Sequence, residues 1–454
     1  MKKIHFISIG GSAMHNLAIA LHKKGYLVTG SDDEIVEPSK SRLQQSGLLP
    51  DQDGWQPDLI TADLEAVIIG MHARKDNPEL LRAEELGLRI YSYPEYIYEQ
   101  SKEKTRLVIG GSHGKTTTTA MIMHVLKYAG LNFDFMVGAS LPGFDLTVKL
   151  TDDAPLIIIE GDEYLSSPID PRPKFHLYRA SVAVITGIAW DHVNVFPTLE
   201  VYQKQFAIFL TTIVEKGLLI FNESDLALVD IVKDATRTDL QKDPYGMPAH
   251  LIRNGLTYLI GDDQQEYPLL VFGDHNLMNL NAAFHVCRHL GLEPITFYKA
   301  IADFTGASRR LEKLNENGFT TIFSDFAHSP SKLKATTAAV KEQFPARKLI
   351  ACMELHTFSS LNPPFLDQYA SSMDEADTAI VYFNSHTLEH KKLPPLDPEV
   401  VKNAFNRPDL LVFTSSDLLV SYLKALKLDD SNLLLMTSGN FGGLDIKDLA
   451  FSLI

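Results

Sequence analysis

Residues 106–117 read RLVIGGSHGKTT, an apolar run followed by a glycine-rich turn and a Lys-Thr-Thr triplet. The segment Arg106–Ile109 predicts a buried strand, and the apolar spacing in Thr118–Tyr128 predicts an amphipathic helix. A strand, a tight glycine turn and a helix in this order are typical of α/β domains with parallel sheets. This stretch therefore predicts both the fold class and the place where a ligand would bind.

The loop of this segment offers the groups that a nucleotide phosphate needs. Glycines let backbone amides turn toward phosphate oxygens, Lys115 brings a positive charge to the β and γ phosphates, and the Thr116 hydroxyl can ligate Mg²⁺. The candidate ATP-binding residues are Gly111, Ser112, His113, Gly114, Lys115, Thr116 and Thr117. The alternative is a plain glycine turn whose lysine faces solvent, and the flanking strand and helix together disfavour it.

The alternation of predicted strands and helices extends over the whole chain. Short runs rich in β-branched residues alternate with helix-length amphipathic segments, which is the pattern of parallel sheets with crossover helices, so the predicted class is α/β. At roughly 150 residues per domain, 454 residues suggest three domains. Polar connections place their expected bounds at 1–104, 105–306 and 307–454.

A second glycine turn follows the first predicted strand, Ile4–Ile9, and a second strand ends in an acidic residue. The candidate substrate-binding residues here are Gly10, Gly11, Ser12, Ala13, Met14 and Asp32. A helix N-terminus at this turn suits a nucleotide diphosphate. Asn16 stands where the dinucleotide fingerprint has its last glycine, which disfavours NAD. Such turns also occur in α/β folds without any ligand, so this signal is weaker than the first.

Acidic side chains follow a third apolar strand, predicted at Leu156–Glu160. Glu160, Asp162 and Glu163 lie at its carboxyl end, where open α/β sheets keep their active sites and where hard cations find oxygen ligands. A neighbouring strand, predicted at Val182–Ile188, leads to Asp191-His192. A solvated acidic loop and a structural histidine are the alternative interpretations of these two segments.

The composition excludes several classes of protein. Lys and Arg number 42 against 57 Asp and Glu, a net charge of -15, so no general surface for nucleic acid is expected. No run reaches the roughly 18 apolar residues of a membrane span, and a cytoplasmic protein without membrane contact is expected. Cys287 and Cys352 lack metal-ligand spacing and are predicted to be reduced core residues.

These motifs, in this order, resemble the Mur ligases, the ATP-dependent amide-forming family of peptidoglycan synthesis. The resemblance covers essentially the full length. It implies a Rossmann-like N-terminal domain, a central P-loop ATPase-like domain with a mostly parallel sheet, and a Rossmann-like C-terminal domain. It also implies nucleotide contacts by four further residues, namely His275, Asn276, Arg310 and Asp325.

The resemblance further implies the substrates. The glycine turn at Gly10–Met14 and the strand end at Gly30–Asp32 are similar to those of the members that take UDP-N-acetylmuramate as acyl donor. These members lack a carbamylated lysine, and Phe206 stands at that lysine's place. The amine is then L-alanine or the tripeptide L-alanyl-γ-D-glutamyl-meso-diaminopimelate. Glu163-Tyr164, Asp325–His328 and Met436–Gly443 resemble the tripeptide-using member more closely. A monomer or weak homodimer is expected.

Roles also come from the resemblance. Lys115, His192 and Arg310 are the catalytic candidates, and Thr116, Glu160 and His192 are the expected ligands of Mg²⁺, of which two ions are expected. The γ-phosphoryl group of ATP would activate the sugar-borne carboxylate, and closure of the domains would keep water out. Two rivals remain: a nucleotide-binding regulator that has lost ligation, and a folyl-polyglutamate type ligase, which lacks a separate UDP-binding domain.

Overall fold

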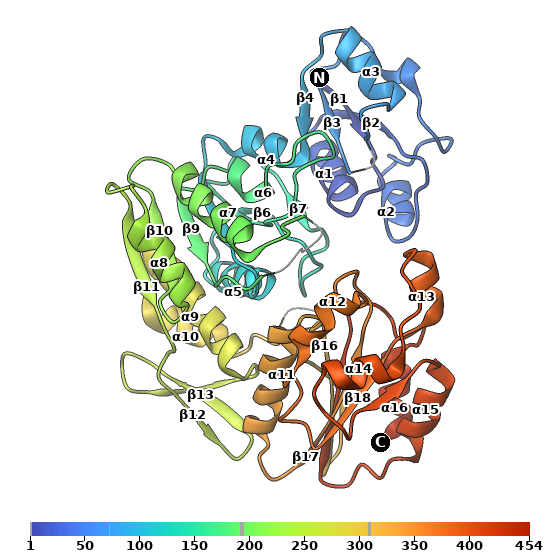
Figure 1. Ribbon diagram of the computed structural model, residues 1–454. Helices are drawn as coiled ribbons and strands as arrows, with labels where there is room; N and C mark the ends of the chain where they lie inside the picture. The colour runs from blue at the N-terminus through green and yellow to red at the C-terminus, as the bar shows by residue number, and fades with distance from the viewer. Residues whose placement is uncertain (1, 72, 191–194, 307–309) are drawn as a thin grey trace. The chain divides into compact units, whose positions relative to one another are not determined.

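The computed structural model describes residues 2–71, 73–190, 195–306 and 310–454 (Figure 1). The described chain is mixed α/β with four sheets. A wholly parallel sheet and a mostly parallel sheet lie in a first compact unit, and the other two sheets lie in a second. Thr198–Gly246 and Ala282–Gly291 belong to the first unit, whereas Met247–Asn281 lies with the C-terminal residues in the second. No helix in these described ranges has the length and apolar character needed to cross a bilayer.

The N-terminal sheet is parallel throughout, with the order β2-β1-β3-β4. Its strands are β1 (Lys3–Ile7), β2 (Leu27–Ser31), β3 (Ala66–Ile69) and β4 (Ile90–Ser92), and its helices are α1 (Ser12–Lys23), α2 (Ser39–Gln45), η1 (Pro57–Leu59), α3 (Pro78–Glu85) and α4 (Tyr93–Ser101). The first strand ends two residues before the predicted Ile9, because Ser8 takes a positive φ of 71° that an extended strand cannot hold. This early end opens the glycine turn.

The central sheet has the order β11-β10-β9-β5-β8-β6-β7, parallel except for the last pair. Its strands are β5 (Thr105–Gly110), β6 (Asp134–Met136), β7 (Val148–Lys149), β8 (Leu156–Glu160), β9 (Val182–Ile185), β10 (Leu218–Asn222) and β11 (Gln241–Tyr245), with helices α5 (Lys115–Tyr128), α6 (Lys174–Leu177), α7 (Leu199–Thr212) and α8 (Leu226–Asp234). β8 matches its prediction residue for residue, whereas β9 stops at Ile185 instead of Ile188. The Thr186 hydroxyl donates to the carbonyl oxygens of Gly110 and His113, which turns the chain out of the sheet.

The second unit contains an antiparallel three-stranded sheet and a six-stranded sheet ordered β15-β16-β20-β17-β18-β19. The strands are β12 (His250–Arg253), β13 (Leu256–Ile260), β14 (Glu266–Leu269), β15 (Glu312–Glu316), β16 (Thr320–Asp325), β17 (Lys348–Glu354), β18 (Thr378–Tyr382), β19 (Leu411–Phe413) and β20 (Ser431–Met436). The helices that follow β14 are α9 (Asp274–His289), which crosses between units, then α10 (Pro294–Ile301), α11 (Pro330–Gln343), α12 (Pro363–Leu366), η2 (Asp367–Tyr369), α13 (Ser385–His390), α14 (Pro398–Ala404), α15 (Ser416–Ala425) and α16 (Ile446–Leu453).

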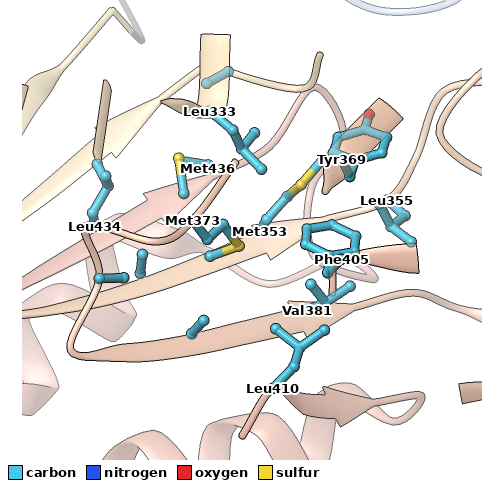
Figure 2. Close-up of a cluster of buried hydrophobic side chains, with 14 of the residues drawn as sticks. Leu333, Met353, Leu355, Tyr369, Met373, Val381, Phe405, Leu410, Leu434 and Met436 are labelled. Carbon is cyan, nitrogen blue, oxygen red and sulfur yellow. The ribbon is translucent and has the colours of Figure 1, made fainter. Parts of the chain in front are cut away.

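The six-stranded sheet is buried on both faces, as its continuous apolar strands predict. Along β17, Ala351 and Met353 enter one core together with Leu333 of α11 (Figure 2), whereas Ile350 and Cys352 enter the core on the opposite face. This alternation follows from the two-residue period of a strand. Cys352 is fully buried and free, as is Cys287, which confirms that both are reduced core residues.

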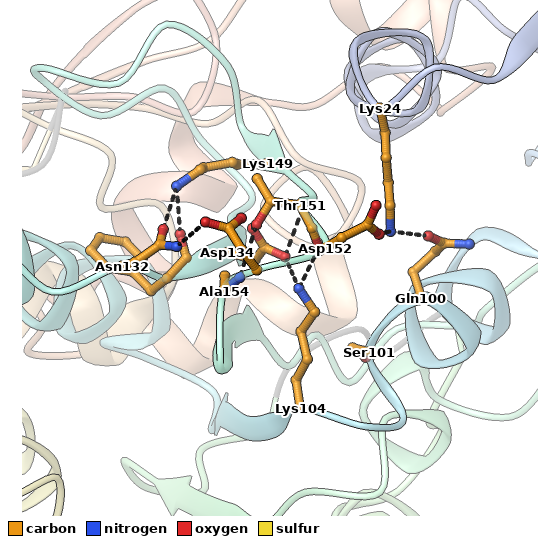
Figure 3. A network of polar contacts seen from close by, with 12 residues as sticks. Lys24, Gln100, Ser101, Lys104, Asn132, Asp134, Lys149, Thr151, Asp152 and Ala154 are labelled. Atoms are coloured by element: carbon orange, nitrogen blue, oxygen red, sulfur yellow. Dashed lines mark hydrogen bonds and ion pairs between the residues drawn. The ribbon is translucent and has the colours of Figure 1, made fainter.

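A buried polar cluster fixes the edge of the central sheet (Figure 3). The Asp134 carboxylate, fully buried at the start of β6, accepts hydrogen bonds from Lys104 Nζ at 2.5 Å and from both the backbone N–H and the hydroxyl of Thr151 at 2.9 Å. Lys24, the residue that follows α1, contacts Asp152 at 2.9 Å next to this cluster. Three donors from two segments, at Lys104 and Thr151, therefore depend on a single carboxylate.

We expect Asp134→Ala to destabilise the protein by about 3–5 kcal/mol, because it leaves the Lys104 ammonium buried without its carboxylate. The thermal unfolding midpoint measures the loss. Asp153→Ala is the matched control. Asp153 lies two residues after Thr151 and its side chain is exposed, so this variant should leave the midpoint almost unchanged. Equal midpoints for the two variants would contradict the role of the buried cluster.

Candidate active site

The loop between β5 and α5 is shaped to bind an anion. Gly111 and Gly114 have φ angles of 128° and 79°, values that side-chain-bearing residues rarely adopt. Gly114 is the N-cap of α5 and carries no side chain to occupy the first helical amides. The amides and the positive end of a 14-residue helix therefore face the loop, as in other phosphate sites. The helix starts at Lys115, three residues earlier than predicted.

Gly111 cannot be exchanged for a larger residue without moving the loop. A Cβ at this position would lie 2.1 Å from Thr186 Oγ1 and 2.9 Å from the Thr186 nitrogen. We expect Gly111→Ala to weaken ATP binding at least about tenfold, because displaced amides no longer converge on a phosphate. Isothermal titration measures the affinity. Gly25→Ala has a comparable positive φ of 93° but open space around its Cβ, and it should bind ATP like the parent chain.

Lys115 is paired with Glu163, one of the three carboxylates at the carboxyl end of β8, a contact that the sequence does not predict. Its Nζ donates to Gly111 O at 2.6 Å and to Glu163 Oε2 at 2.7 Å. Burial alone would lower the pKa of Lys115, but the negative charge of Glu163, with that of its acidic neighbours, outweighs burial and raises this pKa. Tyr202 donates to Glu163 Oε1 at 3.0 Å and lies 2.8 Å from Ser112 Oγ. Lys115 is therefore a fixed cation.

Thr116 and Glu160 meet at the carboxyl edge of the central sheet. The Thr116 hydroxyl donates to Glu160 Oε1 at 2.7 Å, and Gly138 N donates to Glu160 Oε2 at 2.8 Å. Both donors to a metal would be oxygens, which fits Mg²⁺. Among the described residues there is no cluster of three or more His, Cys, Asp or Glu that could hold a metal ion. His192 lies outside the described residues.

Tyr202 and Phe206 lie one turn apart on α7, and both are fully buried. Their rings contact each other at 5.3 Å, and Phe206 also contacts Phe175 at 5.4 Å. Phe206, which the resemblance places where some Mur ligases carry a modified lysine, is thus part of an aromatic core. Tyr202 is not among the predicted site residues. Its one signal in the sequence is its place four residues before Phe206, on the same face of the predicted helix.

In the N-terminal sheet, Asp32 braces the glycine turn. Its Oδ2 accepts from Gly10 N at 2.8 Å and its Oδ1 accepts from Asp33 N at 3.0 Å, and the side chain is buried. Both of these bonds are to backbone amides, and the contact of Asp32 to a substrate stays a prediction. Asn16 Oδ1, at the place of the missing glycine, accepts from Thr147 N of the central domain segment at 3.2 Å.

The remaining predicted nucleotide contacts lie in the second unit. Asp325, at the end of β16, accepts from Leu311 N and Ala327 N, both at 2.6 Å. Burial raises the pKa of Asp325 and the positive charge of Arg310 opposes this shift. The Arg310 guanidinium stacks 4.9 Å from the Phe326 ring.

His275 lies at the start of α9, next to Asn276, whose side chain donates to Phe272 O at 2.9 Å. Burial lowers the pKa of His275 to about 4, an effect that Asp274 opposes and Arg310 strengthens. Its Nδ1 is buried and has no hydrogen-bond partner within the described part of the chain. The ring is neutral near pH 7 and retains capacity for a hydrogen bond to an uncharged base.

The C-terminal segment Met436–Gly443, which the resemblance points to, contacts the end of β17. Glu354 at the end of β17 accepts from the Thr437 hydroxyl and from Phe441 N at 2.9 Å. Burial by itself would raise the pKa of Glu354, but these donors and His356 outweigh it, and the pKa is lowered. An ionised carboxylate therefore organises the carboxyl edge of this sheet.

Comparison with known proteins finds three family models in sequence order. Residues 3–105 match "Mur ligase family, catalytic domain", residues 109–287 match "Mur ligase middle domain", and residues 309–439 match "Mur ligase, glutamate ligase domain". Together they span nearly the whole chain.

Individual relatives fall into two groups. The UDP-N-acetylmuramate--L-alanyl-gamma-D-glutamyl-meso-2,6-diaminoheptandioate ligase of Haemophilus influenzae is 28% identical, and the match covers 99% of each chain. The UDP-N-acetylmuramate--L-alanine ligase of Caldicellulosiruptor bescii is 32% identical over 84% of this chain and 83% of its own. The crystal structure of a murein peptide ligase from Psychrobacter arcticus aligns with a TM-score of 0.66 at 24% identity, covering 100% and 99% of the two chains.

Proposed function

The chain belongs to the Mur ligase family, and from this premise we propose that it uses ATP to join UDP-N-acetylmuramate to the tripeptide L-alanyl-γ-D-glutamyl-meso-diaminopimelate. The bond formed is an amide between the lactyl carboxylate of the sugar and the amine of the peptide. The observation that carries the choice of tripeptide is the match of 99% of both chains to the tripeptide ligase of Haemophilus influenzae.

L-alanine is the second candidate amine. A ligase for L-alanine is 32% identical to this chain, a higher identity than 28%, although over a shorter match. The segment Thr437–Phe441, which contacts Glu354, resembles the tripeptide-using member in sequence and supports the tripeptide. The segment Met353–Phe358, which contains Glu354, partly resembles the L-alanine ligase and keeps L-alanine as the alternative. An acidic edge also suits the ammonium group of a diaminopimelate.

The reaction requires activation, since a carboxylate and an amine do not condense in water. In the proposed sequence the γ-phosphoryl group of ATP passes to the lactyl carboxylate, and ADP leaves. The amine then attacks the acyl phosphate carbon, the tetrahedral intermediate expels phosphate, and the amine proton passes to solvent. Catalysis of phosphoryl transfer rests on positioning and on cations placed where negative charge develops. Lys115 is such a cation, fixed in the loop by Glu163.

Thr116 and Glu160 would hold Mg²⁺, since their oxygens already lie 2.7 Å apart. When bound, this ion would neutralise charge on the ATP phosphates. The oxygen-only donor set and the burial of Glu160 support this assignment. His192 is proposed as ligand of a second Mg²⁺, on the strength of the sequence resemblance alone.

The other assignments are also proposals. The domains at 1–104 and 105–306 would bind the UDP-sugar and ATP, respectively, and the domain at 307–454 would complete the ATP site and the amine site. The glycine turn braced by Asp32 supports a diphosphate contact in the first, with Gly10 to Met14 lining it. His275, Asn276, Arg310 and Asp325 are proposed nucleotide contacts, and the neutral ring of His275 with an unused Nδ1 supports a contact to adenine.

Product mass tests the function directly. The full chain is incubated with ATP, Mg²⁺, UDP-N-acetylmuramate and equal concentrations of L-alanine and the tripeptide. We expect the tripeptide adduct in at least about tenfold excess, because buried polar groups that recognise the longer peptide stay unpaired with alanine. Phosphate release should require both the sugar and an amine.

Other outcomes decide between the candidates. An excess of the L-alanine adduct would overturn the proposal that the tripeptide is the amine substrate and would support L-alanine. Phosphate release that does not depend on the sugar, together with no adduct, would indicate a nucleotide-binding protein that has lost ligation.

A further inference from the structure

A cavity of about 620 Å³ opens in the first unit at the ends of α1 and α5 that lie away from their glycine turns. Lys23 of α1 and Lys127 of α5 line it, together with β6, β7 and the segment 143–146. Lys127 is twelve residues from Lys115 on one helix, a separation of about 18 Å. The cavity, here called the α1–α5 cavity, is thus separate from the candidate active site.

Aromatic rings form one wall of this cavity. Phe135 contacts Phe144 edge to face at 5.2 Å, and Phe133 lies 6.4 Å from Phe144. Leu131, at the mouth, leaves 41% of its surface exposed. A concave site with apolar and aromatic walls is the usual form of a small-molecule site, and the volume lies within the range of such sites.

Three lysines surround this apolar wall. Lys23, Lys127 and Lys149 form no ion pair with any carboxylate of the described residues. Among the described residues that line the cavity, Asp145 is the one with an acidic side chain. Lys127 Nζ lies 5.0 Å from the Phe144 ring centre and donates to a single carbonyl oxygen, so two of its three N–H donors remain. Unpaired lysines at one place are notable in a chain of net charge -15.

The cavity walls are also held in place without a ligand. Thr151, at the edge of the cavity, is fixed by the buried Asp134 carboxylate and Lys104 (Figure 3). Lys149, beside it, donates to Phe133 O at 2.9 Å, which ties β7 to the aromatic wall. A site that is already ordered costs little conformational entropy when it binds.

We propose that the α1–α5 cavity binds a small aromatic carboxylate. The aromatic wall receives the ring, and the ammonium groups of Lys23 and Lys127 bind the carboxylate through charge-assisted hydrogen bonds. An uncharged aromatic compound would contact only the aromatic wall, and a polar anion would contact only the lysine ammonium groups. The ligand acts at a distance from the phosphate loop, so binding does not compete with ATP.

Isothermal titration of the full chain with 2-naphthoate tests this proposal. ADP, Mg²⁺ and UDP are present at saturation, which blocks the nucleotide sites. We expect one naphthoate per chain, and at least about tenfold weaker binding by the Lys23→Glu/Lys127→Glu variant, because it loses both charge-assisted hydrogen bonds. The uncharged naphthalene-2-carboxamide should bind at least about tenfold more weakly than naphthoate to the parent chain.

The matched control is Lys40→Glu/Lys233→Glu, which changes the net charge by the same amount at two exposed lysines outside the cavity. It should bind naphthoate like the parent chain. All four positions are exposed, so both variants should fold, and thermal unfolding checks this. The proposal is overturned if the parent chain shows no saturable binding, if nucleotides displace the naphthoate, or if both double variants weaken binding equally.

Discussion

Lys115→Met is expected to lower kcat for ligation by at least about 10³-fold, because the variant loses the fixed cation that offsets charge in phosphoryl transfer. Binding of UDP-N-acetylmuramate should stay within about twofold of the parent value, since the proposed sugar site lies on the N-terminal sheet. Initial rates of phosphate release and calorimetric titration with the sugar nucleotide measure the two quantities.

Loss of stability must be separated from loss of catalysis here. Removing the ammonium leaves Glu163 buried, with 1% of its side chain exposed, and without its ion-pair partner. The double variant Lys115→Met/Glu163→Gln removes both charges and should recover most of the unfolding midpoint while remaining inactive. Recovery of activity in the double variant would mean that Lys115 serves only to neutralise Glu163. Lys233→Met, at an exposed lysine, is the surface control.

Glu160→Gln should reduce kcat by about 10²–10⁴-fold and raise the Mg²⁺ concentration for half-maximal rate at least about tenfold. The amide oxygen can still accept from Gly138 N and the amide nitrogen can donate to Thr116, so the local hydrogen bonds survive and only the charge is lost. Initial rates over a Mg²⁺ titration measure both effects.

Glu103→Gln makes the same chemical change at an exposed residue and should leave the titration unchanged. An unaltered Mg²⁺ dependence in Glu160→Gln would remove this residue from the proposed metal site. A fall in the unfolding midpoint without a change in Mg²⁺ dependence would indicate a structural role for the carboxylate.

Local features were predicted well because their causes are local. Apolar β-branched runs such as Leu156–Glu160 form strands wherever they are buried, and a glycine turn before Lys115 leads into a helix. Boundaries were less accurate where a single backbone angle or side-chain bond decides them. Ser8 ends β1 early through its positive φ, and Thr186 turns the chain out of β9.

The sequence by itself determined the α/β class, the order of strands and helices around residues 106–117, and the residue types of the phosphate loop, because these depend on periodicity and on contiguous residues. Only the tertiary structure decided which groups meet that loop. Tyr202 and Glu163 reach it from 90 and 48 residues away, and Asp32 is bonded to a backbone amide of its glycine turn. The physical reason is that burial of a charge requires a partner, and the packing of the sheets selects that partner from distant parts of the chain.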